Sequence, residues 1–464
     1  MVNNQISIVQ QKQTSTLEVG RMATYLQSKI IEALDENGKT YYLFFYKNEY
    51  LTYCKATHVH DESFLKSAFT SGITFSSHHP LTQVSLNLEK PYRKYSFQQL
   101  CKRNEQKYTH QECAVIATYF DSFIPKDELL TYIKEIFYQY QRNGQTYLGY
   151  RIIKILQSFA PEDQWVQDFG SKLAYNKYED IYNKPSEELQ KKDPVWAEQM
   201  LFLQMDQDLY YDRLCSILKK EHRMTELITI ALRKFSMSPS QSVYSSLLSL
   251  CEEHFNLDQT VVILETLLTQ HPSFEPLYKD IMKIYKTLNQ PTKLLQLVIE
   301  NNLPIPHNQL TYFESIFDQI DLESENIKVE SLNKFIPKVY SSDVERQEKF
   351  IRKCVHHLLK KHDITFIEEW VGPMKANGHN LPIFHKIEQM LQIRNDPDQQ
   401  QQLGELYFQF QHFDQAIECF SFEMELKEND PKPVKWLSKV YQEIGLTEES
   451  KAYQQLYKDM QKNA

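Results

Sequence analysis

Apolar residues recur every three or four positions along most of the chain beyond residue 95, a spacing typical of amphipathic helices. The clearest case runs from residue 127 to residue 161, where two such patterns flank a turn at Arg142-Asn143-Gly144. This arrangement predicts two antiparallel helices. Further helical patterns follow to the end of the chain. We therefore expect a mainly α-helical protein.

The first 95 residues follow a different pattern, in which aromatic and β-branched residues run together as they do in β-strands. Such runs occur at four places: 40–46, 50–59, 72–76 and 82–88. A helical pattern at 21–35 precedes them and ends at Asn37-Gly38. The sequence predicts a small α+β domain at residues 1–95.

A tripeptide recurs near the end of the chain, because Asn395-Asp396-Pro397 returns 34 residues later as Asn429-Asp430-Pro431. Apolar or small residues recur at the same interval: Leu403 and Leu437, Tyr407 and Tyr441, Ala416 and Ser450. The agreement of these positions indicates a repeated unit at 397–464.

The first copy carries Leu403-Gly404, Tyr407, Ala416 and Phe420 at spacings that resemble the tetratricopeptide repeat, a helix-turn-helix unit. In that family the small residues let the two helices approach closely, and the large ones fill the groove between neighbouring units. Two departures stand out: Glu423 replaces a small residue, and the second copy has Ser438 where the first has Gly404.

Weaker copies of the same period lie upstream, since Cys251 and Tyr285 are also 34 residues apart. A charged segment bracketed by prolines, NKPSEELQKKDPV, favours a linker at 183–195. We therefore predict an α-solenoid of tetratricopeptide-like helical hairpins after a small α+β domain. The predicted parts are the α+β domain at 1–95, helical hairpins at 96–182, the linker at 183–195, a degenerate solenoid at 196–396 and two repeats at 397–464.

Composition supports helix packed on helix, because only 10 of the 464 residues are glycine and tight turns between strands consume glycine. The formal net charge is −9, which argues against a dedicated nucleic-acid-binding protein. Seven scattered cysteines without a C-x-x-C pair are typical of reduced thiols inside the cell. With no secretory signal pattern and no long apolar run, we expect a cytoplasmic protein that does not enter the membrane.

Two groups of histidines raise the question of a metal site. Cys54, His58 and His60 alternate along a predicted strand and would share one face of it. Asp61 and Glu62 follow just beyond them. Histidine and cysteine on a half-buried strand are ordinary packing residues, and no second acidic cluster at ligand spacing supports a metal. A second group, Cys354, His356, His357 and His362, lies on a predicted helix, where exposed histidines are the simpler account. The sequence predicts no metal and no cofactor.

Basic and aromatic residues alternate at 90–107, in KPYRKYSFQQLCKRNEQK. Together they can hold single-stranded nucleic acid, with cations on phosphates and rings on bases. The alternative is a basic segment that pairs with acidic helices nearby. We favour the second interpretation because the chain as a whole is acidic.

The resemblance to tetratricopeptide repeats implies that one face of each first helix lines a concave surface. In this sequence the matching positions that we take as a peptide-binding surface are Glu405, Phe408, Lys432, Lys435, Lys439 and Gln442. An ion pair between Glu405 and Lys439 is the structural alternative. An acidic peptide or helix fits the lysine ridge.

The hypothesis is a non-enzymatic scaffold or regulator that binds a protein or peptide in the concave face of its solenoid. One alternative is an enzyme or ligand-sensing module in residues 1–95, regulated by the helices. Another is nucleic-acid binding through 90–107. No local constellation of nucleophile, base or nucleotide loop indicates an enzyme, and the sequence does not indicate an oligomeric state.

Overall fold

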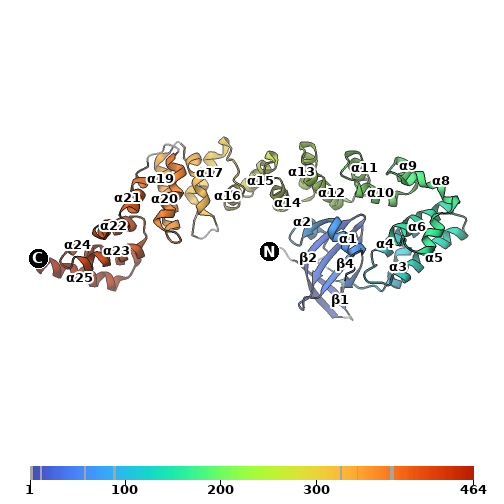
Figure 1. The fold of residues 1–464 in the computed structure, drawn as a ribbon, viewed down its shortest axis with the longest axis horizontal. Helices are drawn as coiled ribbons and strands as arrows, with labels where there is room; N and C mark the ends of the chain where they lie inside the picture. Colours follow the sequence, from blue (N-terminus) through green and yellow to red (C-terminus); the bar gives the residue numbers. More distant parts are fainter. Residues whose placement is uncertain are drawn as a thin grey trace. The chain divides into compact units, whose positions relative to one another are not determined.

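The computed structural model describes residues 4–10, 13–56, 59–86, 90–323, 327–341, 343–376 and 381–463. The protein is mainly α-helical, with a small sheet domain at its N-terminal end, as the sequence predicts (Figure 1). The chain divides into two compact units, Met1–Ile284 and Tyr285–Ala464, and the boundary falls within helix α15 (Glu275–Thr287).

A seven-stranded sheet forms the N-terminal part of the first unit, in the strand order β5-β4-β3-β2-β1-β7, with β6 paired to β2. The strands are β1 (Gln5–Gln10), β2 (Gln13–Tyr25), β3 (Ser28–Leu34), β4 (Thr40–Tyr46), β5 (Glu49–Lys55), β6 (Ile73–Ser76) and β7 (Tyr92–Arg93). The pairs are antiparallel except β1 with β7. Tyr50 and Tyr53 of β5 donate side-chain hydrogen bonds to the carbonyls of Arg93 and Val9, both at 2.8 Å. These bonds draw the two ends of the strand order together, so the sheet curls.

Strand β4 is buried on both faces, which explains its continuous aromatic run. On one face Phe44 lies 4.9 Å from Phe120 in the turn after α4, measured between ring centres. On the other face Phe45 meets Tyr92 across the inside of the curl, at 6.1 Å. Alternate side chains therefore fill two separate layers of the core.

The helix predicted at 21–35 is wrong, because this segment forms the hairpin of β2 and β3. Its turn contains Leu26 at φ 54°, a left-handed conformation that glycine or asparagine normally takes. The hairpin also buries residues of both faces, so neither alternation nor a turn residue marked it in the sequence.

The strand predicted at 82–88 is also wrong, because residues 82–85 belong to helix α2 (Pro80–Ser85) and residues 87–88 lie outside the described part of the chain. The Nδ1 atom of His79 accepts a hydrogen bond from the backbone of Leu81 at 3.2 Å, and Pro80 holds the first helical position. This cap and proline start the helix. The runs at 40–46 and 72–76 are confirmed as β4 and β6, and β5 ends at Lys55.

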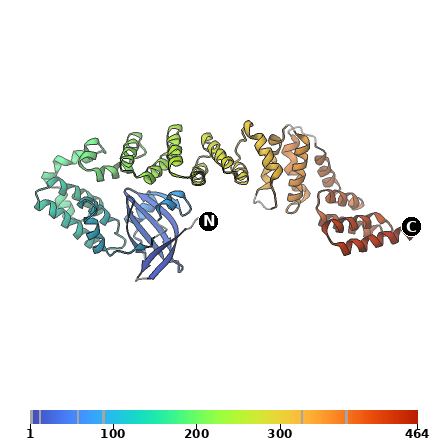
Figure 2. The ribbon, with the colours of Figure 1, turned by 180° about the vertical axis from the view of Figure 1, so that it is seen from behind.

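Helices cover the sheet in the rest of the first unit. Helices α4 and α1 lie on the face of β4, and α2 lies against α12 and α14 (Figures 1 and 2). The helices are α1 (Phe64–Ser71), α3 (Phe97–Glu105), α4 (His110–Thr118), α5 (Lys126–Arg142), α6 (Thr146–Phe159), α7 (Gln164–Gly170), α8 (Leu173–Tyr182), α9 (Glu187–Lys192), α10 (Pro194–Leu203), α11 (Asp208–Lys220), α12 (Met224–Met237), α13 (Gln241–His254) and α14 (Leu257–Gln270).

The segment 183–195 is not an open linker in the structure, because it contains α9 and the buried residue Asp193. The carboxylate of Asp193 accepts hydrogen bonds from Gln111 and Tyr182, both at 2.8 Å, and from the backbone of Trp196 at 3.0 Å. Its charge-rich composition therefore belongs to a segment that is fixed to its neighbours and caps α10.

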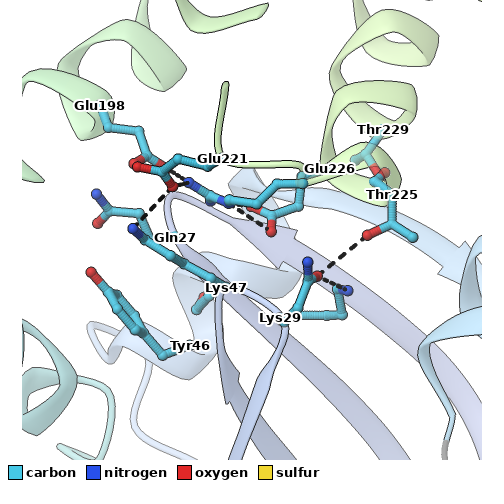
Figure 3. A network of polar contacts seen from close by, with 12 residues as sticks. Gln27, Lys29, Tyr46, Lys47, Glu198, Glu221, Thr225, Glu226 and Thr229 are labelled. Atoms are coloured by element: carbon cyan, nitrogen blue, oxygen red, sulfur yellow. Dashed lines mark hydrogen bonds and ion pairs between the residues drawn. The ribbon is translucent and has the colours of Figure 1, made fainter. Parts of the chain in front are cut away.

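A buried ion network joins the sheet to α10, α11 and α12 (Figure 3). Arg223, only 3% exposed, binds Glu198 at 2.6 Å, donates from Nε to Glu226 at 3.0 Å and reaches Glu221 at 3.1 Å. Burial by itself disfavours the charge, but the two buried carboxylates raise the pKa of Arg223 above its ordinary value. The guanidinium is therefore held charged inside the protein.

The turn between β4 and β5 completes this network from the sheet side. Lys47 binds Glu221 at 3.1 Å, while the side chain of Asn48 accepts hydrogen bonds from Lys29 at 3.3 Å and Thr225 at 3.4 Å (Figure 3). Lys29 is buried, and burial lowers its pKa. Ion pairs and hydrogen bonds thus connect the β4–β5 turn to the helices.

We predict that Arg223→Met loosens this junction, because it leaves Glu198 and Glu226 buried without their cation. Breaking a buried ion pair in this way costs about 3–5 kcal/mol. Amide hydrogen exchange in β4 and α10, followed by mass spectrometry, should therefore speed up by roughly 10² to 10³ where opening is limited by this junction.

The control is Arg233→Met, which changes an exposed arginine of the same helix α12 and should shift stability by less than about 0.5 kcal/mol. Equal exchange in both variants would show that the network does not hold the sheet to the helices.

The second unit consists of helices from α16 onward. They are α16 (Pro291–Glu300), α17 (Leu310–Gln319), α18 (Ile336–Val339), α19 (Val344–Leu359), α20 (Ile364–Ala376), α21 (Pro382–Ile393), α22 (Gln400–Gln409), α23 (Phe413–Leu426), α24 (Pro431–Ile444) and α25 (Thr447–Asn463), with 3-10 turns at His307–Gln309, Val329–Lys334 and Pro397–Gln399. The last four helices form two hairpins, α22 with α23 and α24 with α25.

The small residues of the repeat lie where the two helices of each hairpin meet. In the first hairpin, a Cβ added to Gly404 would lie 2.8 Å from the ring of Phe420. In the second, Ser438 donates to the carbonyl of Ser450 at 3.1 Å, and Ser450 donates back to the carbonyl of Ser438 at 2.9 Å. One copy uses the absence of a side chain, and the other uses a reciprocal pair of hydrogen bonds.

We predict that Gly404→Ala destabilises the second unit by about 1–2 kcal/mol, because overpacking costs about 1–3 kcal/mol and alanine regains less than about 1 kcal/mol of helix propensity. Phe420 cannot move easily, since it is fully buried and stacks on Trp436 with ring centres 5.6 Å apart. Urea denaturation measures the loss. In a Phe420→Leu background the same change should cost clearly less, and equal costs in both backgrounds would contradict this contact.

Candidate peptide-binding site

The lysine ridge predicted from the sequence lies on α24. Lys432, Lys435, Lys439 and Gln442 are all exposed there. The ammonium group of Lys439 lies 4.3 Å from the ring centre of Trp436, and that of Lys435 lies 5.9 Å from the ring centre of Tyr457 on α25. The two lysines therefore rest on different rings.

The two predicted residues on α22 are half-buried. Phe408 packs edge-on against Trp436, with ring centres 5.2 Å apart, so Phe408 and Lys439 contact the same indole. Glu405 accepts a hydrogen bond from Gln401 at 3.2 Å. Within the described residues it forms no ion pair with Lys439, so the structural alternative of a Glu405–Lys439 pair is not realised.

A second surface, which sequence reasoning missed, is a pocket of about 500 Å³ between α17, α19 and the end of α22. Its volume lies within the range of typical ligand sites. Its lining residues are Phe317, Asp318, Arg346, Lys349, Phe350, Arg352, Lys353, His356, Gln409, Phe410 and Gln411. Four of these are permanent cations, and one is a carboxylate.

The cations come from one helix. Arg346, Lys349, Lys353, His356 and Lys360 follow one another at intervals of three or four residues, so they form a stripe on one face of α19 and its C-terminal end. We call this set the α19 stripe. It gives the pocket one electropositive wall.

Two lining cations have carboxylate partners of their own. Arg346 binds Glu314 at 2.9 Å and also pairs with Asp318, while Arg352 binds Glu348 at 3.1 Å. Although burial opposes it, hydrogen bonds from Arg346 and Tyr340 hold the pKa of Asp318 below its ordinary value. These pairs fix the wall in place without adding free charge.

The remaining two lining lysines, Lys349 and Lys353, have no carboxylate partner among the described residues. Lys349 is exposed and makes no ion pair within the described chain, and Lys353 donates to the carbonyl of Ile320. They lie one helical turn apart. The pocket therefore presents two lysines without ion-pair partners side by side, and Lys349 is near enough to Asp318 to contribute to its lowered pKa.

Aromatic rings form the apolar part of the pocket. Phe317 and Phe350 stack with their ring centres 4.7 Å apart, and Arg352 lies over Phe410 at 5.8 Å. His356 Nδ1 lies 2.9 Å from the carbonyl oxygen of Phe410, so the nitrogen donates this bond. The rings and the two neighbouring lysines together suit a peptide segment in which acidic and apolar side chains alternate.

The predicted histidine groups separate in the structure. His58 lies outside the described residues. Cys54 is described, and burial raises the pKa of its thiol to about 12. On α19, Cys354 is fully buried and His357 pairs with Glu323 at 3.1 Å. His60 lies in the loop between β5 and α1 and lines a hollow with residues 121–126 and the end of α6. Among the residues that the structure describes, no three possible metal ligands come together.

The basic and aromatic segment at 90–107 is largely built into the fold. Arg103 donates to the carbonyls of Tyr50 and Leu51, both at 3.3 Å, and Lys107 pairs with Glu49 at 2.7 Å. The ring of Tyr92 is buried. The segment thus packs within the fold, but its partners here lie on strand β5 and not on the acidic helices that the sequence suggested. None of the helices that the structure describes is long and apolar enough to cross a membrane.

Comparison with known proteins adds little to this picture. No family model and no curated protein matches the chain. Among solved structures, it is similar to a structure of Naa15/Naa10 bound to HypK-THB, with 11% sequence identity and a TM-score of 0.20. The alignment covers 78% of this chain and 60% of that chain, so the chain spans less than two thirds of that chain's length. At this TM-score the likeness carries no argument about function.

Proposed function

We propose that the protein is a non-enzymatic scaffold whose second unit binds an acidic, partly apolar peptide segment of a partner protein. The observation that carries this proposal is the pocket along α19, where Lys349 and Lys353 lie beside stacked aromatic rings. A peptide with two acidic side chains and an apolar one between them would satisfy both parts of the pocket.

Preformed helices favour such a role, because the pocket wall is fixed before the partner arrives and the partner bears most of the ordering entropy. A cytoplasmic location is part of the proposal. It is supported by the seven free cysteines, of which Cys113, Cys251, Cys354 and Cys419 are buried.

The lysine ridge of α24, with Glu405 and Phe408 beside it, is a second proposed contact for the same class of partner. Its exposed ammonium groups are also positive, but they rest on separate rings. We place the principal contact at the α19 pocket, since both of its unpaired lysines border one cavity.

We predict that Lys349→Glu weakens binding of an acidic probe peptide by at least about tenfold, because it replaces attraction with repulsion at the pocket wall. The probe is a fluorescently labelled peptide with one central phenylalanine and two glutamates on each side, and its Kd is measured by fluorescence anisotropy. Lys349 is exposed and makes no ion pair in the described chain, so the fold should be unaffected.

Two controls define the site. The same peptide with lysines in place of glutamates should not bind the wild-type protein. Lys435→Glu reverses a charge on α24 and should change Kd by less than about threefold. If Lys435→Glu abolishes binding and Lys349→Glu does not, the partner binds the α24 ridge. If the wild-type protein does not bind the acidic peptide, the proposal is wrong.

A further inference from the structure

The first unit contains a cavity of about 220 Å³ between the sheet and its covering helices. Its walls come from the β2–β3 turn, α1, the end of α4, α6 and α10. A larger hollow of about 730 Å³ adjoins it, because Glu62, Asp121, Ser158 and Phe159 line both. Two carboxylates, Glu62 and Asp121, therefore lie where the two hollows meet.

Aromatic rings from separate elements surround the inner space, and we call it the aromatic cavity. They are Tyr25, Phe64, Tyr119, Phe159 and Trp196. Phe64 stacks on Tyr119 with ring centres 4.2 Å apart and an interplanar angle of 18°, and Tyr25 lies 5.6 Å from Phe64. Ring faces carry partial negative charge and attract cations.

The carboxyl group of Asp121 is held at the edge of this cavity. One oxygen, Oδ2, accepts a hydrogen bond from the backbone of Phe64 at 2.8 Å. The other, Oδ1, is buried and has no hydrogen-bond partner in the described chain. Burial raises the pKa of Asp121 to about 6, against the opposing effect of the backbone N–H groups of Phe64 and Ser122. A half-buried carboxylate of this kind would gain from a bound cation beside it.

The hydroxyl oxygen of Tyr119 is a second buried polar atom in this region. Tyr119 is 0% exposed, yet its hydroxyl group has no hydrogen-bond partner among the described residues. Both this hydroxyl oxygen and Asp121 Oδ1 lie inside the wall with almost no accessible surface. A ligand in the cavity therefore meets the half-buried rings and the accessible part of the Asp121 carboxyl group instead.

The wall opposite is fixed by the β2–β3 turn. Gln27, which is buried, donates to the carbonyl of Val195 at 2.9 Å and accepts from Gln199 at 2.9 Å. These bonds hold the neighbouring Leu26, another lining residue, in its left-handed conformation. The cavity is therefore set before a ligand enters.

Charge at the rim is mixed, because Glu62, Glu162 and Lys126 all line the outer hollow. Glu62 is exposed where the two hollows adjoin, and Glu162 of the outer hollow already pairs with Lys126. His60 also lines the outer hollow. Because the volume of about 220 Å³ is below the roughly 300–1,000 Å³ of drug-sized sites, a small group fits best.

We propose that the aromatic cavity binds a small organic cation, an alkylammonium group that lies among the rings and pairs with Asp121. The ammonium group can belong to a free amine or to a lysine side chain of a bound protein. This inference is independent of the proposed peptide site, which lies in the second unit.

The test is isothermal titration calorimetry of the full-length protein with choline. Its matched control is 3,3-dimethylbutan-1-ol, which has the same shape without the charge. We expect choline to bind with a Kd on the order of 1 mM or below and one-to-one stoichiometry, and the neutral alcohol to bind at least about tenfold more weakly. No binding of choline, or equal binding of the two compounds, would overturn the proposal.

A variant pair tests the role of the carboxylate. Asp121→Asn keeps an oxygen that can accept from Phe64 but removes the charge, and should weaken choline binding by at least about tenfold. Asp127→Asn removes an exposed carboxylate from the first turn of α5 and should leave the Kd unchanged. If Asp121→Asn fails to fold, Trp196→Leu removes a ring instead and should weaken choline but not the neutral alcohol.

A third arm distinguishes the source of the cation. The acetylated methylamide of trimethyllysine carries the same head group on a peptide backbone. Binding tighter than choline would indicate a lysine side chain of a protein, and weaker binding would indicate a free amine. If neither cation binds the wild-type protein, the cavity is not a cation site.

Discussion

The first unit depends on the charge of Arg223. Burying a guanidinium to 3% exposure without a counter-charge would cost too much free energy. The burial is tolerated because Glu198 and Glu226 are buried with Arg223. The three side chains come from α10, from α12 and from the residue just before α12, and Lys47 extends the network to the sheet. Such a network contributes little net stability but accepts only one arrangement of its parts. It therefore fixes where α10 lies against the β2–β3 turn, and with it one wall of the aromatic cavity.

The second unit is organised by a different constraint, the close approach of paired helices. The two repeats achieve this close approach at the same place with different chemistry. In the first, Gly404 lies against Phe420, and in the second, Ser438 and Ser450 exchange hydrogen bonds. Close packing inside each hairpin leaves the outer faces free to vary. The α19 stripe is an example, since its cations occupy one face while Cys354 and its neighbours fill the core.

The sequence revealed the features that depend on local pattern. A helical array, a small N-terminal sheet domain and the positions of β4 and β6 all follow from periodicity and side-chain type. The β2–β3 hairpin was hidden because Leu26, and no glycine, occupies the left-handed turn position. The α2 helix was hidden because its start depends on His79 as a capping residue, a role that serine or aspartate usually fills.

The candidate sites were harder to predict because they combine residues far apart in the chain. The basic residues of the α19 stripe have helical spacing, so the sequence alone could place them on one face of a helix. The rings that complete the pocket come from α17 and the end of α22, and the sequence does not show that they lie nearby. The aromatic cavity draws on five elements between residues 25 and 199. No single segment carries its pattern. Only the tertiary contacts place Asp121 beside Phe64 and leave one of its oxygens without a partner.

The two proposed sites have opposite charge in a chain whose net charge is −9. Screening limits the reach of a charge to about 8 Å at physiological ionic strength, so the overall excess of acid decides little at either site. At the α19 pocket the unpaired Lys349 and Lys353 act within that distance, whereas at the aromatic cavity burial reduces screening around Asp121. Recognition in the first unit should therefore depend less on salt than recognition in the second, because only the cavity removes its charge from solvent.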